Sequence, residues 1–257
     1  MHIKAMLRLG GVCALSLVVM LGLGTIGHLR QLSDPTDIIL QDGILLVLML
    51  GLNAEWLRVP IFLRSALPLR RQVTINLVPL SIMGLTGLEL LNFARVQLQP
   101  FVMPVTLAFL LALCVASYEE YFFRGLVLAL VMRLMPHHLL SAVTGASLIF
   151  GLFHLVNWVH QPLNVTLLQV GNAWAMGMLL AAVYLRTRGL LWPVVWHFAN
   201  DFTVMVMSGL AEDTRPTASV SLGVLVAVIY VGTALFLLRP AHREGLEWPT
   251  QPAEHVW

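Results

Sequence analysis

Charged side chains are scarce in this chain of 257 residues. Only 11% of its residues are Asp, Glu, Lys or Arg, whereas a soluble domain carries roughly 25%. Hydrophobic residues account for 58%, and the mean hydropathy is +0.84. A chain with so few charges cannot cover a surface that faces water. We therefore expect an all-α, multi-pass integral membrane protein whose permanent partner is the lipid bilayer.

Cysteine is also nearly absent. The chain has two, Cys13 and Cys114, and both lie in apolar runs. They form neither a disulfide framework nor a CxxC metal-binding pair, and we interpret them as small buried hydrophobic side chains. The net charge is only +2, and the basic residues are scattered at the ends of apolar segments instead of lining one face. This distribution excludes nucleic acid as a partner.

Long apolar runs fill most of the chain. A helix needs about 20 apolar residues to cross the hydrocarbon core of a bilayer. The sequence therefore predicts one membrane domain over residues 1–257, with about eight transmembrane helices. Seven is the alternative, because Gln41 and Asp42 interrupt the second run. The predicted spans lie near residues 9–27, 38–57, 73–91, 101–133, 139–157, 165–186, 190–210 and 218–238, and a solvated tail follows at 239–257.

The basic residues predict how these spans are oriented. Lysine and arginine concentrate in the loops on the cytoplasmic side of a membrane. With eight spans, Arg30, Arg95 and Arg215 fall on one side, and eleven basic residues fall on the other: Lys4, Arg8, Arg58, Arg64, Arg70, Arg71, Arg133, Arg186, Arg188, Arg239 and Arg243. We therefore expect both termini, and the tail, in the cytoplasm. The host membrane would be the inner (cytoplasmic) membrane of a bacterium, or the ER membrane of a eukaryote.

Polar residues also interrupt the fourth, fifth and seventh predicted spans. An ionisable residue inside a span indicates a functional site, because burying it is costly unless it is paired or solvated. The stretch "SYEEYFFRG" contains Glu119, Glu120 and Arg124. Glu120 and Arg124 are four residues apart, so they share a helix face and can pair. Glu119 points about 100° away and is free to face another partner.

Two further spans contribute imidazoles. His154 follows Phe150 by four residues in "FGLFHLVNW", so an aromatic ring can cover one side of its imidazole. In "WPVVWHFANDF", His197 shares a helix face with Asp201 and nearly so with Asn200. Three helices would thus direct carboxylate, imidazole and amide groups into one polar cavity inside the membrane.

Several chemistries suit such a cavity. A glutamate removed from water becomes a usable general base for hydrolysis of a peptide bond, and histidines with Asn200 can donate hydrogen bonds to an oxyanion. The same carboxylates and imidazoles suit a divalent metal that activates water. They also suit a proton relay or an ion site in a transporter, or contacts that merely hold helices together. The spacing alone leaves these alternatives open. The zincin motif HExxH is absent from the sequence.

Taken together, the three motifs resemble those of the CPBP (Abi) intramembrane proteases, a family that includes the type II CaaX prenyl endopeptidases. The family pattern is EExxxR, FxxxH and then HxxxN or HxxxD, on successive transmembrane helices. The motifs appear here in that order, as "EEYFFRG", "FGLFH" and "HFAND", over residues 119–201.

The resemblance implies an eight-helix fold, a catalytic core at about residues 101–210 and hydrolysis of peptide bonds within the membrane. Glu119 would activate a water molecule with the help of His154. His197 and Asp201 would stabilise the oxyanion or complete the water site, while Glu120 and Arg124 would orient the helix.

One position departs from the common family pattern. The last residue is often Asn, whereas this chain has Asp201 with Asn200 beside it. An ionised carboxylate cannot donate a hydrogen bond, so we expect Asp201 to orient His197 or bind a metal, and Asn200 to supply the amide. Whether a metal takes part is left open by the resemblance. The candidate ligands for one divalent ion, such as zinc, are Glu119, His154, His197 and Asp201.

The sequence therefore predicts an endopeptidase for membrane-embedded or lipid-modified proteins and peptides. The alternative is a non-proteolytic membrane protein with the same cavity, either transporter-like or a bacteriocin self-immunity protein. The shared site also poses a test of depth. By helical rise, His197 lies ~10 Å from the end of its predicted span and Glu119 ~22 Å from the end of its own. For the two residues to share a site, the fourth predicted span must tilt or project from the membrane, or the helix of the seventh must begin earlier.

Overall fold

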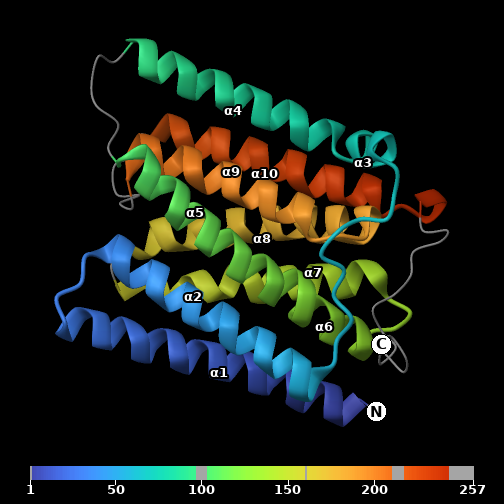
Figure 1. The fold of residues 1–257 in the computed structure, drawn as a ribbon. Helices are drawn as coiled ribbons and strands as arrows, with labels where there is room; N and C mark the ends of the chain where they lie inside the picture. The colour runs from blue at the N-terminus through green and yellow to red at the C-terminus, as the bar shows by residue number, and fades with distance from the viewer. Residues whose placement is uncertain (1, 97–102, 160, 210–216, 243–257) are drawn as a thin grey trace.

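The computed structural model describes residues 2–96, 103–159, 161–209 and 217–242, and every regular element in these ranges is a helix (Figure 1). The all-α prediction is therefore confirmed. In chain order the elements are α1 His2–Leu29, α2 Asp34–Leu52, η1 Asn53–Leu57, α3 Leu69–Ile75, α4 Leu77–Val96, α5 Val105–Glu119, η2 Glu120–Val127, α6 Leu128–Leu134, α7 Leu139–Phe153, η3 His154–Val159, α8 Leu163–Thr187, α9 Leu191–Ser208, α10 Thr217–Leu237 and η4 Pro240–His242.

Five helical stretches of the described residues are long and apolar enough to cross a membrane. They are His2–Leu29, Asp34–Leu57, Val105–Leu134, Leu139–Val159 and Leu163–Thr187, and Gly223–Leu237 is a shorter apolar helix. A multi-pass membrane protein is thus confirmed in outline. Within the described residues each of the eight predicted spans overlaps helix, but α4, α9 and α10 are not among the five, so the count of eight stays a prediction.

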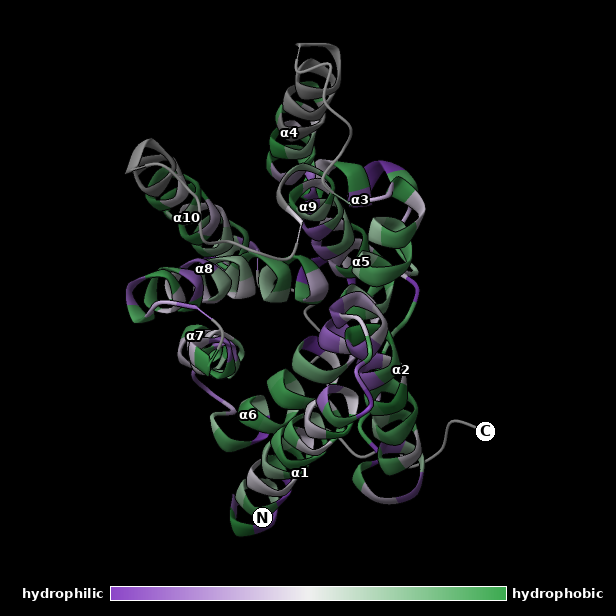
Figure 2. Cartoon of the chain, turned by 90° about the vertical axis from the view of Figure 1, so that its left-hand side faces the viewer, coloured by the Kyte–Doolittle hydropathy of each residue, from purple (hydrophilic) through white to green (hydrophobic). Residues whose placement is uncertain are grey.

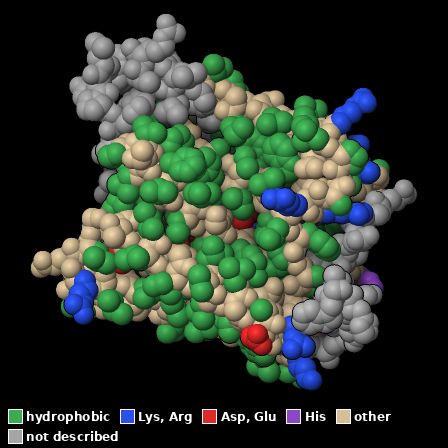
Figure 3. All heavy atoms as spheres, in the orientation of Figure 1, with side chains coloured by type: hydrophobic (Ala, Val, Ile, Leu, Met, Phe, Trp, Pro, Cys, Tyr) green, Lys and Arg blue, Asp and Glu red, His purple; other side chains and the backbone are tan. Residues whose placement is uncertain are grey.

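The outer surface is as apolar as a lipid-facing surface should be. Large hydrophobic side chains point outward from several helices, among them Leu7, Val47 and Leu85, each more than 60% exposed. Hydrophobic atoms cover most of the face in Figure 3, whereas the Lys and Arg side chains lie mainly along its right-hand edge. Figure 2 shows that this apolar character continues along most of the helices. Lipid tails, and not water, are the natural environment of such a surface.

The bundle places distant basic residues at the same end. Arg8 near the start of α1 lies close enough to Arg133 at the end of α6 for the two charges to interact. Arg71, Arg186 and Arg188 form a second such group. In Figure 1 the start of α1 and the C-terminal element η4 both lie at the right-hand end. This arrangement agrees with the predicted sidedness of the basic loops, and the assignment of that side to the cytoplasm stays a prediction.

Helices α7 and α8 pack closely because each has a glycine at the contact, Gly151 in α7 and Gly177 in α8. A Cβ built on Gly151 would lie 2.7 Å from the carbonyl oxygen of Val170, and one built on Gly177 would lie 2.9 Å from Cβ of Ser147. Neither position leaves room for a methyl group, and the first is blocked by backbone that cannot rotate away. These two glycines therefore fix the distance between α7, which carries Phe150 and His154, and its neighbour.

We expect Gly151→Ala to destabilise the protein by about 1–3 kcal/mol, the usual cost of overpacking. Gly145→Ala on the same helix is the matched control, because its Cβ would find Val131 Cγ1 at an ordinary 3.8 Å. Alanine favours helix over glycine by about 1 kcal/mol, so the control should be neutral or stabilising. Thermal unfolding of both variants in detergent measures the difference. Equal midpoints would show that α7 and α8 can separate without cost.

Candidate active site

The first motif lies where a helix changes its winding. The α-helix α5 ends at Glu119, and a π-helical segment, η2, takes over from Glu120 to Val127. Every residue of η2 is buried, including Glu120 and Arg124. π-Helical turns are rare and occur frequently at functional sites, because the wider turn moves side chains out of the regular helical register. Gly125 is part of this segment, and a Cβ there would lie 2.8 Å from Cδ1 of Ile61 in the loop that precedes α3.

Glu120 is the hub of the buried charges. Its Oε1 lies 2.7 Å from Nη1 of Arg124 and 2.6 Å from Nδ1 of His197, and its side chain is 0% exposed. The guanidinium of Arg124 also stacks over Phe150, with Cζ 4.3 Å from the ring centroid. Since the carboxylate can only accept, Nδ1 of His197 carries the hydrogen of this bond, and Nε2 is the nitrogen left for other partners.

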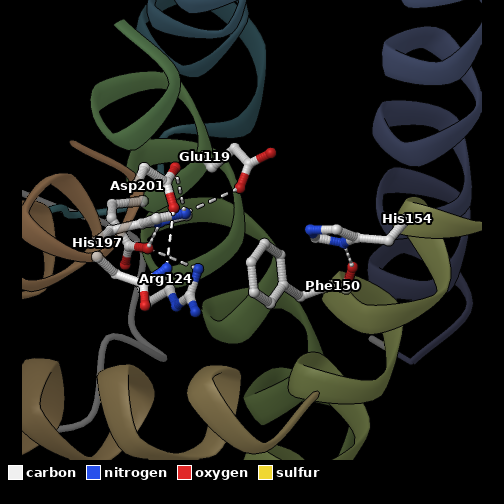
Figure 4. A network of polar contacts seen from close by, with 8 residues as sticks. Glu119, Arg124, Phe150, His154, His197 and Asp201 are labelled. Carbon is white, nitrogen blue, oxygen red and sulfur yellow. Dashed lines mark hydrogen bonds and ion pairs between the residues drawn. The ribbon is translucent and has the colours of Figure 1, made fainter. Parts of the chain in front are cut away.

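Nε2 of His197 faces two further carboxylates. It lies 3.5 Å from Oε2 of Glu119 and 3.4 Å from Oδ2 of Asp201 (Figure 4). Glu119 and Asp201 are 21% and 18% exposed, whereas Glu120 is fully enclosed. The structure thus brings α5 and α9 together at one polar cluster, which we define as Glu119, Glu120, Arg124, His197 and Asp201. Within this cluster only Glu119 and Asp201 present carboxylates that a water molecule or a substrate can reach.

The structure also shows how Glu119 and His197, which lie at different depths in their predicted spans, come to share one site. Helix α9 begins at Leu191, one residue from the predicted start, so an earlier start does not account for the shared site. The continuous helical stretch Val105–Leu134 has 30 residues. At 1.5 Å per residue it spans about 45 Å, well beyond the ~30 Å hydrocarbon core. The stretch Val105–Leu134, which corresponds to the fourth predicted span, is therefore long enough to tilt or to project from the membrane.

His154 stands apart from this cluster. It caps the end of α7, its Nδ1 lies 3.1 Å from the carbonyl oxygen of Phe150, and its ring meets that of Phe150 edge to face at 5.0 Å. Figure 4 shows the Phe150 ring between His154 and the polar cluster. Among the described residues His154 has no hydrogen bond or ion pair to the cluster, although it is near enough to interact electrostatically with Glu119.

Asn200 and Asp201 diverge, as adjacent residues on a helix must. Asp201 points toward His197, whereas Asn200 is exposed and donates a hydrogen bond to Oδ1 of Asp201, with Nδ2 3.1 Å away. Asn200 also lines a small pocket between α4, α8, α9 and α10, together with Trp196, Tyr230 and apolar side chains. Of the two candidates for the last motif position, Asp201 is therefore the one that contacts His197.

Sequence reasoning missed Asp42, a buried carboxyl close enough to the polar cluster to interact with it electrostatically. It lies in α2, is only 6% exposed, and has no hydrogen-bond partner among the described residues. Its carboxyl interacts electrostatically with Glu119, Asp201 and His197. Helix α2 packs on α5 next to this point, where Sγ of Cys114 lies 3.4 Å from the carbonyl oxygen of Ile39. An acidic residue inside an apolar run was the available signal, and we interpreted it only as a weakness of the second span.

The predicted metal ligands do not form a metal site in the described residues. The contact of Glu120 with Nδ1 of His197 is the kind of support that orients metal-binding imidazoles. However, no three His, Cys, Asp or Glu side chains among the described residues are placed to hold one ion, and His154 faces the carbonyl of Phe150. A divalent metal stays a prediction, and the mechanism below contains no step that uses one.

Comparison with known proteins gives one match. Residues 101–203 match the family model described as type II CAAX prenyl endopeptidase Rce1-like, and this segment contains the whole polar cluster together with His154 and Asn200. The searches of curated proteins and of solved structures returned no match. The similarity of residues 101–203 to the Rce1-like type II CAAX prenyl endopeptidases confirms the family resemblance drawn from the three motifs.

Proposed function

We propose that the protein is an intramembrane endopeptidase that cleaves membrane-embedded or lipid-modified proteins or peptides, with Glu119 as the base that activates water. The observation that carries this proposal is the orientation of His197 between carboxylates. Glu120 holds its Nδ1 at 2.6 Å, while its Nε2 faces Glu119 at 3.5 Å. The family match over residues 101–203 supports the same reaction class.

The reaction can be written with the residues of the cluster alone. Glu119 accepts a proton from a water molecule, and the water oxygen bonds to the carbonyl carbon of the substrate. The oxyanion that forms needs a hydrogen-bond donor, and Nε2–H of His197 serves that purpose. Because Nδ1 already carries the hydrogen of its bond to Glu120, His197 is then the doubly protonated imidazolium, and it keeps both protons throughout the reaction. When the tetrahedral intermediate collapses, the C–N bond breaks and the proton held by Glu119 passes to the leaving amine. One water molecule is consumed, and Glu119 returns to its starting state.

The fixed charges around Glu120 prepare this arrangement. Glu120 and Arg124 are too enclosed to touch a substrate, since their side chains are 0% and 2% exposed. Their role is to hold His197 with Nε2 toward Glu119. Asp201 contacts the same nitrogen from α9 and restrains the imidazole from the other side. His154 assists Glu119 electrostatically from beyond the Phe150 ring.

Cleavage by the purified protein tests the proposal. The protein is reconstituted in lipid vesicles with a library of membrane peptides, with and without lipid modification, and products are identified by mass spectrometry. New peptide termini support an endopeptidase, and the sequences at the cut sites define the substrate. Ion-dependent uptake without cleavage would support the transporter-like alternative. Treatment with a chelator, followed by added zinc, tests whether a divalent metal takes part. Cleavage that persists supports the mechanism above, and loss of cleavage that zinc restores supports a metal.

Asp42 provides a second test, in which activity and stability move in opposite directions. Asp42→Leu removes a buried carboxyl that lacks a hydrogen-bond partner among the described residues, which should stabilise the protein by about 1–3 kcal/mol. If Asp42 shapes the field at Glu119, cleavage should fall at least tenfold. Gln41→Leu, at the neighbouring position of α2, is the matched control and should retain activity. Full activity in Asp42→Leu would remove Asp42 from the site.

A further inference from the structure

Arg8 faces the interior of the bundle, although it lies near the chain terminus. The inner stripe of α1 is marked by Ala5, Val12 and Ser16, which are 8%, 0% and 0% exposed. Ser16 hydrogen-bonds to Tyr118 of α5, with 2.5 Å between the two hydroxyl oxygens. Arg8 lies three residues after Ala5 and four before Val12, so it occupies the same stripe, and it is half-buried.

Arg133 lies at the end of α6, which packs against α1, and it is near enough to Arg8 for the two charges to interact. It is half-buried as well, and its Nε and Nη2 atoms are shielded from solvent without a hydrogen-bond partner in the part of the chain that the structure describes. These two nitrogens form one edge of the guanidinium, the edge that binds a carboxylate or a phosphate through two parallel hydrogen bonds. The charges of Arg8 and Arg133 repel each other.

No acidic side chain among the described residues relieves this repulsion. Arg8 lies over the ring of Trp56, with Cζ 5.9 Å from the ring centroid. The acidic residue next to Trp56 in the sequence is Glu55. It is exposed, and it forms no ion pair with Arg8 or Arg133. Two half-buried cations and an unpartnered guanidinium edge therefore share one corner of the bundle. Buried donors without acceptors are costly. An anion at this corner would offset the repulsion between the two arginines and would accept hydrogen bonds from the free edge of Arg133.

We propose that Arg8 and Arg133 bind a phosphate group between α1 and α6, and that its source is the headgroup of an anionic phospholipid. Basic pockets between transmembrane helices bind such headgroups. Trp56 is 46% exposed beside Arg8, and tryptophan prefers the headgroup level of a bilayer. The site is separate from the proposed active site, because Arg133 follows Glu119 by 14 residues, or about 20 Å along the helix.

Lipid binding to the purified protein tests this site. Native mass spectrometry in a neutral detergent counts bound phosphatidylglycerol, and thermal unfolding with and without this lipid measures its effect. We expect wild type to retain one tightly bound molecule and to gain about 5 °C in melting temperature at saturation. In the double variant Arg8→Gln/Arg133→Gln we expect lipid affinity to fall at least tenfold and the thermal shift to vanish. Arg70→Gln removes an exposed charge from α3 and should behave as wild type.

Two further measurements separate lipid binding from a purely structural role of the arginines and from binding of soluble phosphate. In lipid-free detergent the double variant should be at least as stable as wild type, because it removes a repulsion; a marked loss of stability would show that the arginines serve the fold without an anion. Inorganic phosphate at millimolar concentration tests the source. If it reproduces the full shift, the ligand is a soluble phosphate and the lipid assignment is wrong. An undiminished shift in the double variant would also overturn the site, because general attraction of the basic surface would then suffice.

Discussion

Replacement of Glu119 by glutamine is expected to reduce kcat/KM for peptide cleavage by about 10²–10⁴-fold, the range that a general base contributes. Glutamine has nearly the same shape and can still accept a hydrogen bond from Nε2 of His197, which lies 3.5 Å from Oε2 of the native glutamate. It cannot take a proton from water. The substitution therefore removes the proposed chemistry and leaves the packing of α5 unchanged.

The loss of cleavage identifies the base only if the Glu119→Gln protein is folded. The melting temperature and helical content of Glu119→Gln should match those of wild type. Glu55→Gln is the matched control, because Glu55 is an exposed glutamate of η1 outside the polar cluster, and it should keep full activity. Cleavage by Glu119→Gln at the wild-type rate would refute the assignment of Glu119 as the base, whatever the reaction proves to be.

Helical periodicity was sufficient to predict the two pairs of the polar cluster that lie within one helix, but not the contact of Glu120 with His197 between helices. Residues four apart on one helix share a face, and this rule alone paired Glu120 with Arg124 and His197 with Asp201. Both pairs are present, at 2.7 Å and 3.4 Å. The cost of isolated charges in lipid was the reason to expect that the two helices would direct these faces at each other.

Periodicity could not predict where the regular winding stops. η2 is π-helical, and α7 ends at Phe153, so His154 begins a 3-10 segment. His154 therefore lies at a helix junction, beyond the Phe150 ring from the polar cluster. Asp42 illustrates a second limit, because a hydropathy pattern records a polar residue as a weak span and contains no information about which helix it faces.

Replacement of Arg124 by methionine is expected to lower stability by about 3–5 kcal/mol, the usual cost of removing one partner from a buried ion pair. Glu120 would remain 0% exposed, with His197 as its remaining partner in the cluster. Methionine can fill much of the apolar space over Phe150, where Cζ of Arg124 lies 4.3 Å from the ring centroid. The loss should therefore come from the broken ion pair, which leaves Glu120 with His197 alone, and not from a cavity.

The double variant Glu120→Gln/Arg124→Met separates these two causes. If the unpaired charge of Glu120 is responsible, glutamine at that position should restore part of the lost stability, and the double-mutant cycle should give a coupling energy of about 0.5–3 kcal/mol. Arg70→Met is the exposed control and should change stability by less than about 0.5 kcal/mol. Cleavage should still be impaired in the double variant, because a neutral amide holds the imidazole of His197 less firmly than a carboxylate does. An Arg124→Met protein as stable as wild type would mean that Glu120 does not depend on this pair, and the stabilising role assigned to the pair would be wrong.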